Sequence, residues 1–114
     1  MCGIVGIYNH PEASTLAYLG LHALQHRGQE SAGIVATDGT QWYAHHAMGY
    51  VGDIFTHKVL SDLKGRCAIG HVRYSTFGAS DLKNCQPLMM DSCHGRLSIA
   101  HNGNIVNAQA LKLE

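Results

Sequence analysis

The chain has 114 residues, of which 46% are hydrophobic and 14% charged, and its 8 basic and 8 acidic side chains cancel. This balance excludes the basic surface of a nucleic-acid-binding protein, and no apolar run approaches the roughly 20 residues that cross a bilayer. The first residues also lack the basic and apolar regions of a signal peptide. We therefore expect at most one domain, located in the cytoplasm, with neither a nucleic-acid nor a membrane partner.

The chain opens with a strand pattern followed by a helix pattern. Residues 4–8 are apolar and rich in β-branched side chains, which predicts a short strand that ends in a turn. Ser14 is placed to cap a helix from about residue 15 to residue 25, and Gly28 is placed to end it. This helix would present one apolar face to a sheet.

A hairpin and a second helix are expected next. Residues 31–37 predict a strand, which Asp38-Gly39 joins to a returning strand over 41–46. Apolar residues at helical spacing then predict one continuous helix over 53–63, stopped by glycine at position 65.

The remaining elements complete an α+β pattern with mainly antiparallel strands. Residues 66–75 predict a strand with two distinct faces, one of them carrying Cys67, Ile69, His71, Arg73 and Ser75. Strands are expected over 88–91 and 97–101, and a last helix begins at residue 108. Hairpins between neighbouring strands favour α+β over a doubly wound parallel sheet.

Metal and disulfide chemistry are not expected in this chain. No two of its cysteines are spaced as C-x-x-C, and in a reducing compartment three of them should be free thiols: Cys67, Cys85 and Cys93. The adjacent His45 and His46 would point to opposite faces of a strand and could not easily share one ion.

Cys2 is the strongest candidate nucleophile. If Met1 is removed, this residue carries both a thiol and a free α-amine. The thiolate is the nucleophilic form of cysteine, and an α-amine with a pKa near roughly 7.7–8.0 can serve as its base at neutral pH. One residue can therefore supply both groups, as in N-terminal nucleophiles. A small buried cysteine at the start of an edge strand remains the alternative.

Three further polar stretches could complete an acyl-transfer site. Arg73 lies in an otherwise apolar strand, where its guanidinium would form a structural ion pair or bind a substrate carboxylate. The side chain of Asn102 and the backbone N–H of Gly103 could stabilise an oxyanion, although Asn-Gly is also a common hairpin turn. For the third stretch, residues 25–31, its composition alone favours an ordinary solvated helix end.

Four ordered blocks of the sequence resemble class II glutamine amidotransferases, which are N-terminal nucleophile hydrolases. The blocks read CGIVGI from residue 2, QHRGQESAGI from residue 25, GHVRYST from residue 70 and AHNGN from residue 100. The resemblance implies the first part of an αββα sandwich. It also implies L-glutamine as substrate and no metal or other cofactor in this chain.

The same resemblance implies a role for each candidate residue. Cys2 would attack the glutamine amide, and Asn102 with the Gly103 N–H would hold the oxyanion. Arg73 would bind the substrate α-carboxylate, and two further residues would line the pocket: Thr76 and Gly28.

The wording of the second and third blocks is similar to the branch of the family that opens de novo purine synthesis. In that branch ammonia passes to a phosphoribosyltransferase domain, which makes 5-phosphoribosylamine from phosphoribosyl pyrophosphate with Mg²⁺, and the full-length protein would be a homo-oligomer. The alternatives left open are a glutamine–fructose-6-phosphate aminotransferase and an asparagine synthetase.

Residues 2–114 are shorter than the glutaminase domain of this family. We therefore expect a partial domain, with the phosphoribosyltransferase domain and its ligands absent from this chain. An isolated chain of this length should have weak glutaminase activity or none. A further alternative is a non-catalytic fragment that only associates with another copy through its exposed sheet face.

Overall fold

The computed structural model describes residues 3–25, 29–74, 86–93 and 95–100, and within them the strands form two antiparallel sheets. The larger sheet has the strand order β1 (Gly3–Ile7), β4 (Cys67–Tyr74), β2 (Gln29–Thr37) and β3 (Trp42–Met48). The smaller sheet pairs β5 (Leu88–Ser92) with β6 (Gly95–Ile99). The predicted α+β class with antiparallel pairing is thus confirmed.

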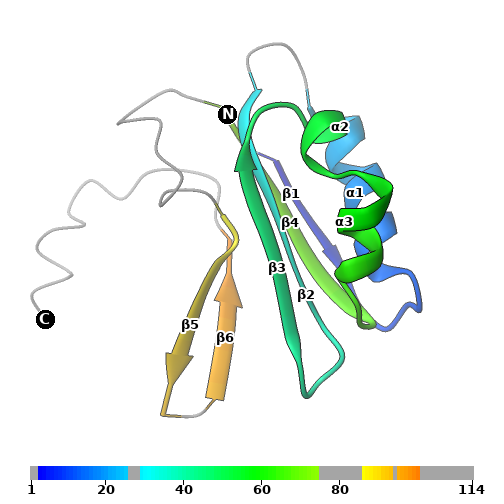
Figure 1. Ribbon diagram of the computed structural model, residues 1–114. Coiled ribbons are helices and arrows are strands. Elements are labelled where there is room, and N and C mark those ends of the chain that lie inside the picture. The colour runs from blue at the N-terminus through cyan, green and yellow to red at the C-terminus, as the bar shows by residue number, and fades with distance from the viewer. Residues whose placement is uncertain (1–2, 26–28, 75–85, 94, 101–114) are drawn as a thin grey trace, which may run out of the picture.

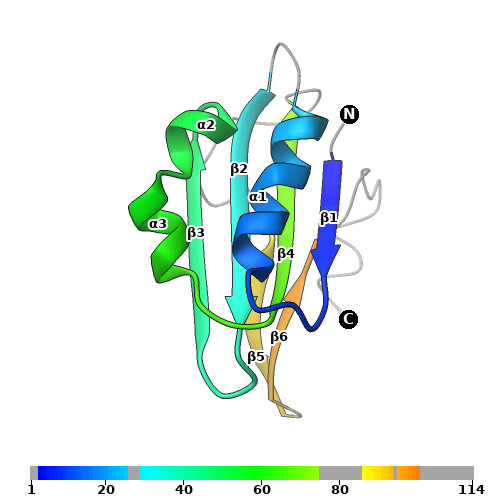
Figure 2. The ribbon, with the colours of Figure 1, turned by 90° about the vertical axis from the view of Figure 1, so that its right-hand side faces the viewer.

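The described elements are stacked in three layers. Three helices cover one face of the larger sheet, called here the helix face: α1 (Ala13–Leu24), α2 (Val51–Ile54) and α3 (His57–Asp62). The β5–β6 sheet lies on the other side, which we call the inner face (Figure 1, Figure 2). No helix of the described residues has both the length and the apolar character needed to cross a membrane.

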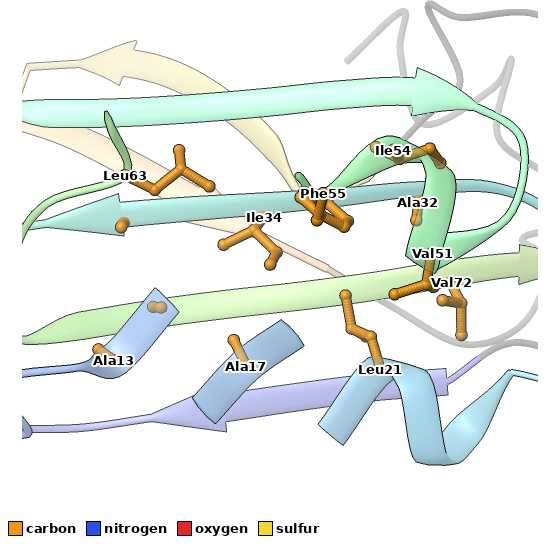
Figure 3. Packing of buried hydrophobic residues seen from close by; sticks show 12 residues of the cluster. Ala13, Ala17, Leu21, Ala32, Ile34, Val51, Ile54, Phe55, Leu63 and Val72 are labelled. Atoms are coloured by element: carbon orange, nitrogen blue, oxygen red, sulfur yellow. The ribbon is translucent and has the colours of Figure 1, made fainter. Parts of the chain in front are cut away.

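The core lies between the helices and the helix face of the larger sheet (Figure 3). Leu21 of α1 packs there with Ile34 of β2 and Val72 of β4, and all three side chains are fully buried. Val51 and Phe55 close the core from the α2 side. Burying such side chains contributes about 1.5–3 kcal/mol each, so this layer anchors the sheet.

The two predicted faces of β4 are confirmed. Ala68 and Val72 belong to the buried cluster on the helix face, whereas Ile69 lines a cavity of about 220 Å³ on the inner face. That cavity also contacts Trp42 of β3 and Leu97 of β6, so it lies between the two sheets.

The boundaries predicted for the first helix were wrong at both ends. The helix begins at Ala13, and Ser14 is inside it, buried, with its hydroxyl donating to the Leu60 carbonyl at 3.3 Å. Ser14 is therefore a packing residue and not the N-cap. The helix ends at Leu24, because Gln25 already has extended backbone angles. Gly28, predicted to end it, lies outside the described residues.

The single helix predicted over 53–63 is instead two short helices. Thr56 has extended backbone angles between them, and its hydroxyl oxygen accepts the N–H of Val59 at 3.3 Å. This interaction makes Thr56 the N-cap of α3. The break allows Ile54, Phe55 and Leu63 all to be buried in the core. One straight helix would not point all three side chains to the same side.

The hairpin predicted at Asp38 is confirmed, although its loop is longer than two residues. The strands pair up to Thr37 and Trp42, and the Asp38 carboxylate accepts the N–H groups of Thr40 and Gln41 at 2.9 and 2.7 Å. These bonds hold the pKa of Asp38 below its ordinary value, because they stabilise the charged carboxylate. The strand predicted over 97–101 lies within the described residues except for its last residue. The helix predicted from residue 108 lies wholly outside them.

Candidate active site

The candidate site residues fall mainly at the edges of what the structure describes. Of the six, Arg73 belongs to a described strand. The other five lie outside the described residues: Cys2, Gly28, Thr76, Asn102 and Gly103. Gly3 and Gln29 directly follow two of them, and Tyr74 and Ala100 are the nearest described residues before the other three. The site can therefore be built from the strands that lead to them.

Three strand ends meet at one end of the larger sheet. β1 begins at Gly3, which lies opposite Val72, and β2 begins at Gln29, which lies opposite Tyr74. The residue after Cys2 is thus the cross-strand partner of the residue before Arg73. Figure 2 shows the starts of β1 and β2 beside the end of β4. The first three sequence blocks therefore reach the same end of the sheet.

The fourth block approaches the same end from the second sheet. β6 runs toward the end of the molecule where β1 begins, as Figure 1 shows, and Ile99 is its last residue. The chain then continues directly to Asn102 and Gly103. The direction of β6 is consistent with one site built from all four blocks.

Arg73 occupies the inner face of the sheet at this end. It is half-buried, and its cross-strand partner is Ser31, which is 1% exposed. The planar donors of a guanidinium match a carboxylate in a bidentate arrangement. The placement on the inner face is the one predicted from the alternation of the strand. Arg73 can therefore present a charged donor to a ligand held between the layers.

Gly3 has a packing role that the sequence analysis did not assign. A Cβ atom at this position would lie 3.0 Å from side-chain atoms of both Leu24 and Val72. A side chain here would make a tight contact, so Leu24 or Val72 would have to shift by a few tenths of an ångström. Only the register of β1 against β4 reveals this constraint, so the sequence carried no clear signal for it.

Gln25, the first residue of the second block, also has an unpredicted structural role. Its side-chain oxygen accepts the backbone N–H of Val51 at 3.1 Å. Val51 is the first residue of α2, where backbone N–H groups have no partner within the helix. Gln25 thus joins the end of α1 to the start of α2. It also fixes the point at which the chain leaves for residues 26–28.

The histidines and cysteines give no metal site in the part of the chain that the structure describes. The ring of His45 packs against that of Phe55 on the helix face, with 5.7 Å between the ring centroids. His46 instead forms a hydrogen bond with the Pro87 carbonyl on the inner face. The prediction that these two side chains point to opposite faces is confirmed. Cys67 and Cys93 are free thiols, as expected, and Cys85 lies outside the described residues.

Comparison with known proteins identifies the class. The sequence profile of the class II glutamine amidotransferases matches residues 1–113. The chain therefore belongs to the class II glutamine amidotransferases. The resemblance read from the four sequence blocks is confirmed.

Two similar proteins of this class are both amidophosphoribosyltransferases. Amidophosphoribosyltransferase 3, chloroplastic, of Arabidopsis thaliana is 57% identical over 111 residues, covering 97% of this chain and 21% of the relative. The amidophosphoribosyltransferase of Bacillus subtilis is 54% identical over 112 residues, covering 97% and 24%. The chain thus spans less than a quarter of the length of these two relatives.

A solved structure agrees with both the fold and the relatives. It is described as the allosteric regulatory enzyme of purine biosynthesis, and it superimposes with a TM-score of 0.88 at 51% sequence identity. The match covers 99% of this chain and 24% of that one. The predicted fold class, part of the sandwich of N-terminal nucleophile hydrolases, is confirmed.

Proposed function

We propose that this chain is the glutamine-hydrolysing part of an amidophosphoribosyltransferase, and that residues 2–114 are part of its glutaminase domain. The observation that carries the proposal is the strand register at the end of the larger sheet. Gly3, the residue after Cys2, lies opposite Val72, the residue before Arg73. Since Cys2 precedes Gly3 and Arg73 follows Val72 in the sequence, this register supports a site that contains both the candidate nucleophile and the candidate carboxylate-binding residue.

The reaction begins after removal of Met1, when Cys2 has a free α-amine. The amine takes the thiol proton, directly or through a water molecule, and the thiolate attacks the carbonyl carbon of the glutamine side chain. The Asn102 amide and the Gly103 N–H stabilise the negative charge on the oxygen. The C–N bond then breaks, and ammonia leaves with the proton that the amine returns. Water hydrolyses the thioester to glutamate and regenerates the thiol.

Binding energy for glutamine comes mainly from its α-carboxylate. Arg73 pairs with this group from the inner face, and Thr76 and Gly28 line the same pocket. A charge-assisted hydrogen bond of this kind contributes about 1.5–3 kcal/mol.

The released ammonia supplies the synthesis of 5-phosphoribosylamine in de novo purine biosynthesis. Phosphoribosyl pyrophosphate and Mg²⁺ bind in a phosphoribosyltransferase domain outside this chain, and no residue described above is assigned to them. The relatives favour this acceptor over fructose 6-phosphate or aspartate, since those compared at 54% and 57% identity are amidophosphoribosyltransferases. A cytoplasmic, homo-oligomeric full-length protein belongs to the same proposal.

The experiment is ammonia release from glutamine by the full-length protein and by its Cys2→Ser variant. Loss of the thiolate should lower turnover at least about a thousandfold, because the covalent step disappears. Cys93→Ser is the matched control, since Cys93 is an exposed free thiol at the β5–β6 turn. Turnover by Cys2→Ser equal to that of Cys93→Ser would refute the proposal.

A further inference from the structure

A row of four residues crosses the inner face of the larger sheet next to Arg73. In the strand register, Ile4 lies opposite His71, His71 opposite Gly33, and Gly33 opposite His46. His71 is fully buried, and it is two residues from Arg73 along β4, on the same face. At about 3.4 Å per residue, the row is about 7 Å from Arg73 along the strand. It therefore borders the position proposed to bind glutamine.

Gly33 leaves a space that the backbone leading to the second sheet fills. A Cβ atom at Gly33 would overlap with the carbonyl oxygen of Gln86 and with the ring of His46. Gln86 is 8% exposed and Pro87 is fully buried, so this backbone is held inside the molecule. Only glycine permits so close an approach of one chain segment to another. This explains a glycine of the second sequence block that the glutaminase mechanism does not use.

His46 binds the same segment from the edge strand. Its Nε2 atom lies 2.6 Å from the carbonyl oxygen of Pro87. A carbonyl oxygen can only accept, so Nε2 carries the hydrogen and donates it. Two consecutive residues ahead of β5 are thus held by two residues that face each other across β2 and β3.

We propose that His46 is a positioning residue for glutamine binding, acting through a latch made by Gly33, His46, Gln86 and Pro87. The inference rests on the proposed function, in which Arg73 binds the glutamine carboxylate. The latch fixes the start of the β5–β6 sheet on the inner face. The latch lies in the row of residues through His71, two positions along β4 from Arg73. When it is lost, the second sheet can separate from the first at this point, and water competes for the guanidinium.

The latch acts on binding and not on bond breaking. His46 lies on the edge strand β3, and two strands, β2 and β4, separate it from β1, which follows Cys2. Its loss should therefore raise the glutamine KM with little change in kcat. The reaction driven by added ammonia bypasses the glutaminase step and should not change.

The experiment uses the full-length protein with three single substitutions. His46→Leu removes the donor, and the glutamine KM should rise about three- to tenfold, the range expected for loss of one partly buried hydrogen bond. His46→Gln retains an amide donor and should restore most of the affinity. His45→Leu is the matched control: it changes the neighbouring histidine on the helix face, and its KM should equal that of the wild type.

Hydrogen exchange of the backbone amides in β5 and β6 tests the latch without using activity. His46→Leu should speed this exchange, and His45→Leu should leave it unchanged. A wild-type KM and wild-type exchange in His46→Leu would overturn the latch. The proposed function fails separately, if the wild-type protein releases no ammonia from glutamine, and the exchange comparison then decides alone whether the latch exists.

Discussion

Replacing Arg73 by alanine should weaken glutamine binding more than it slows the chemical step. The side chain is half-buried on the inner face of β4, opposite the buried Ser31. Alanine removes the positive charge and both N–H groups that would donate hydrogen bonds to a carboxylate. Cys2, the proposed nucleophile, is unchanged in this variant. The effect should therefore fall on KM.

The size of the effect follows from the burial of Arg73. A hydrogen bond to a charged group contributes about 1.5–3 kcal/mol, and every 1.4 kcal/mol is a factor of about ten in affinity. Since the side chain is only half-buried, solvent screening places the expected loss in the lower part of that range. We expect the glutamine KM of Arg73→Ala to rise roughly ten- to thirtyfold. Arg73→Lys keeps the charge but loses the planar fork, so a rise of about fivefold is expected.

The assay is the glutamine concentration that gives half-maximal ammonia release by the full-length protein, with kcat taken from the same curve. Arg66→Ala is the matched control. Arg66 lies just before β4, at the opposite end of the strand, where its exposed Nε–H donates to the side chain of Asn9 at 2.9 Å. Equal glutamine KM values for Arg73→Ala and Arg66→Ala would refute the carboxylate assignment.

Two further predictions concern the folded core and the β2–β3 loop, both measured by urea unfolding of the chain with Trp42, its only tryptophan, as the fluorescent probe. Leu21→Ala should lower the unfolding free energy by about 2–5 kcal/mol, because Leu21 is fully buried. Leu19 is exposed, so Leu19→Ala should change the unfolding free energy by less than about 0.5 kcal/mol. Similar losses for the two variants would contradict the assignment of Leu21 to the core. The folded-state pKa of Asp38 is depressed below 3.8, so its carboxylate stabilises the fold above that pH and the contribution is lost as pH falls through the folded-state pKa. Asp38→Asn should therefore lose less stability than the wild type on acidification below about pH 3.8, and parallel pH profiles would count against the loop hydrogen bonds.

The sequence predicted which residues share a face better than it predicted where elements end. Alternation along β4 assigned Ile69 and Arg73 to one face and Ala68 and Val72 to the other, because side-chain direction in a strand depends only on position. Element ends depend on tertiary contacts. Serine is a preferred N-cap residue, yet Ser14 is buried inside α1. Its hydroxyl donates to the carbonyl of Leu60, 46 residues away in sequence.

The break between α2 and α3 shows the same limit. Apolar residues over 53–63 recur at helical spacing, but the periodicity does not reveal that the buried Phe55 and Leu63 each directly follow the end of a separate helix. The side chain of Thr56 then caps the second helix. A threonine within a helical pattern is compatible with either outcome, and only packing against the sheet decides between them.

The candidate site could be predicted as a set of residue types but not as a spatial arrangement. Cys2, Arg73 and Asn102 stand out in the sequence by their chemistry and by the family blocks around them. The roles of Gly3, Gly33 and Gln25 depend on strand register and on contacts between layers. Register across nonconsecutive strands cannot be read from one sequence.

The proposal that Cys2 is the nucleophile is tested most directly by the state and reactivity of this residue in the purified full-length protein. Intact mass should show that Met1 is absent. A diazoketone analogue of glutamine should then label Cys2 alone, with excess glutamine protecting it, while Cys67 and Cys93 remain unlabelled. Retention of Met1 in active protein would contradict the account, because no free α-amine would be available as the base. Labelling of Cys67 or Cys93 in place of Cys2 would contradict it equally.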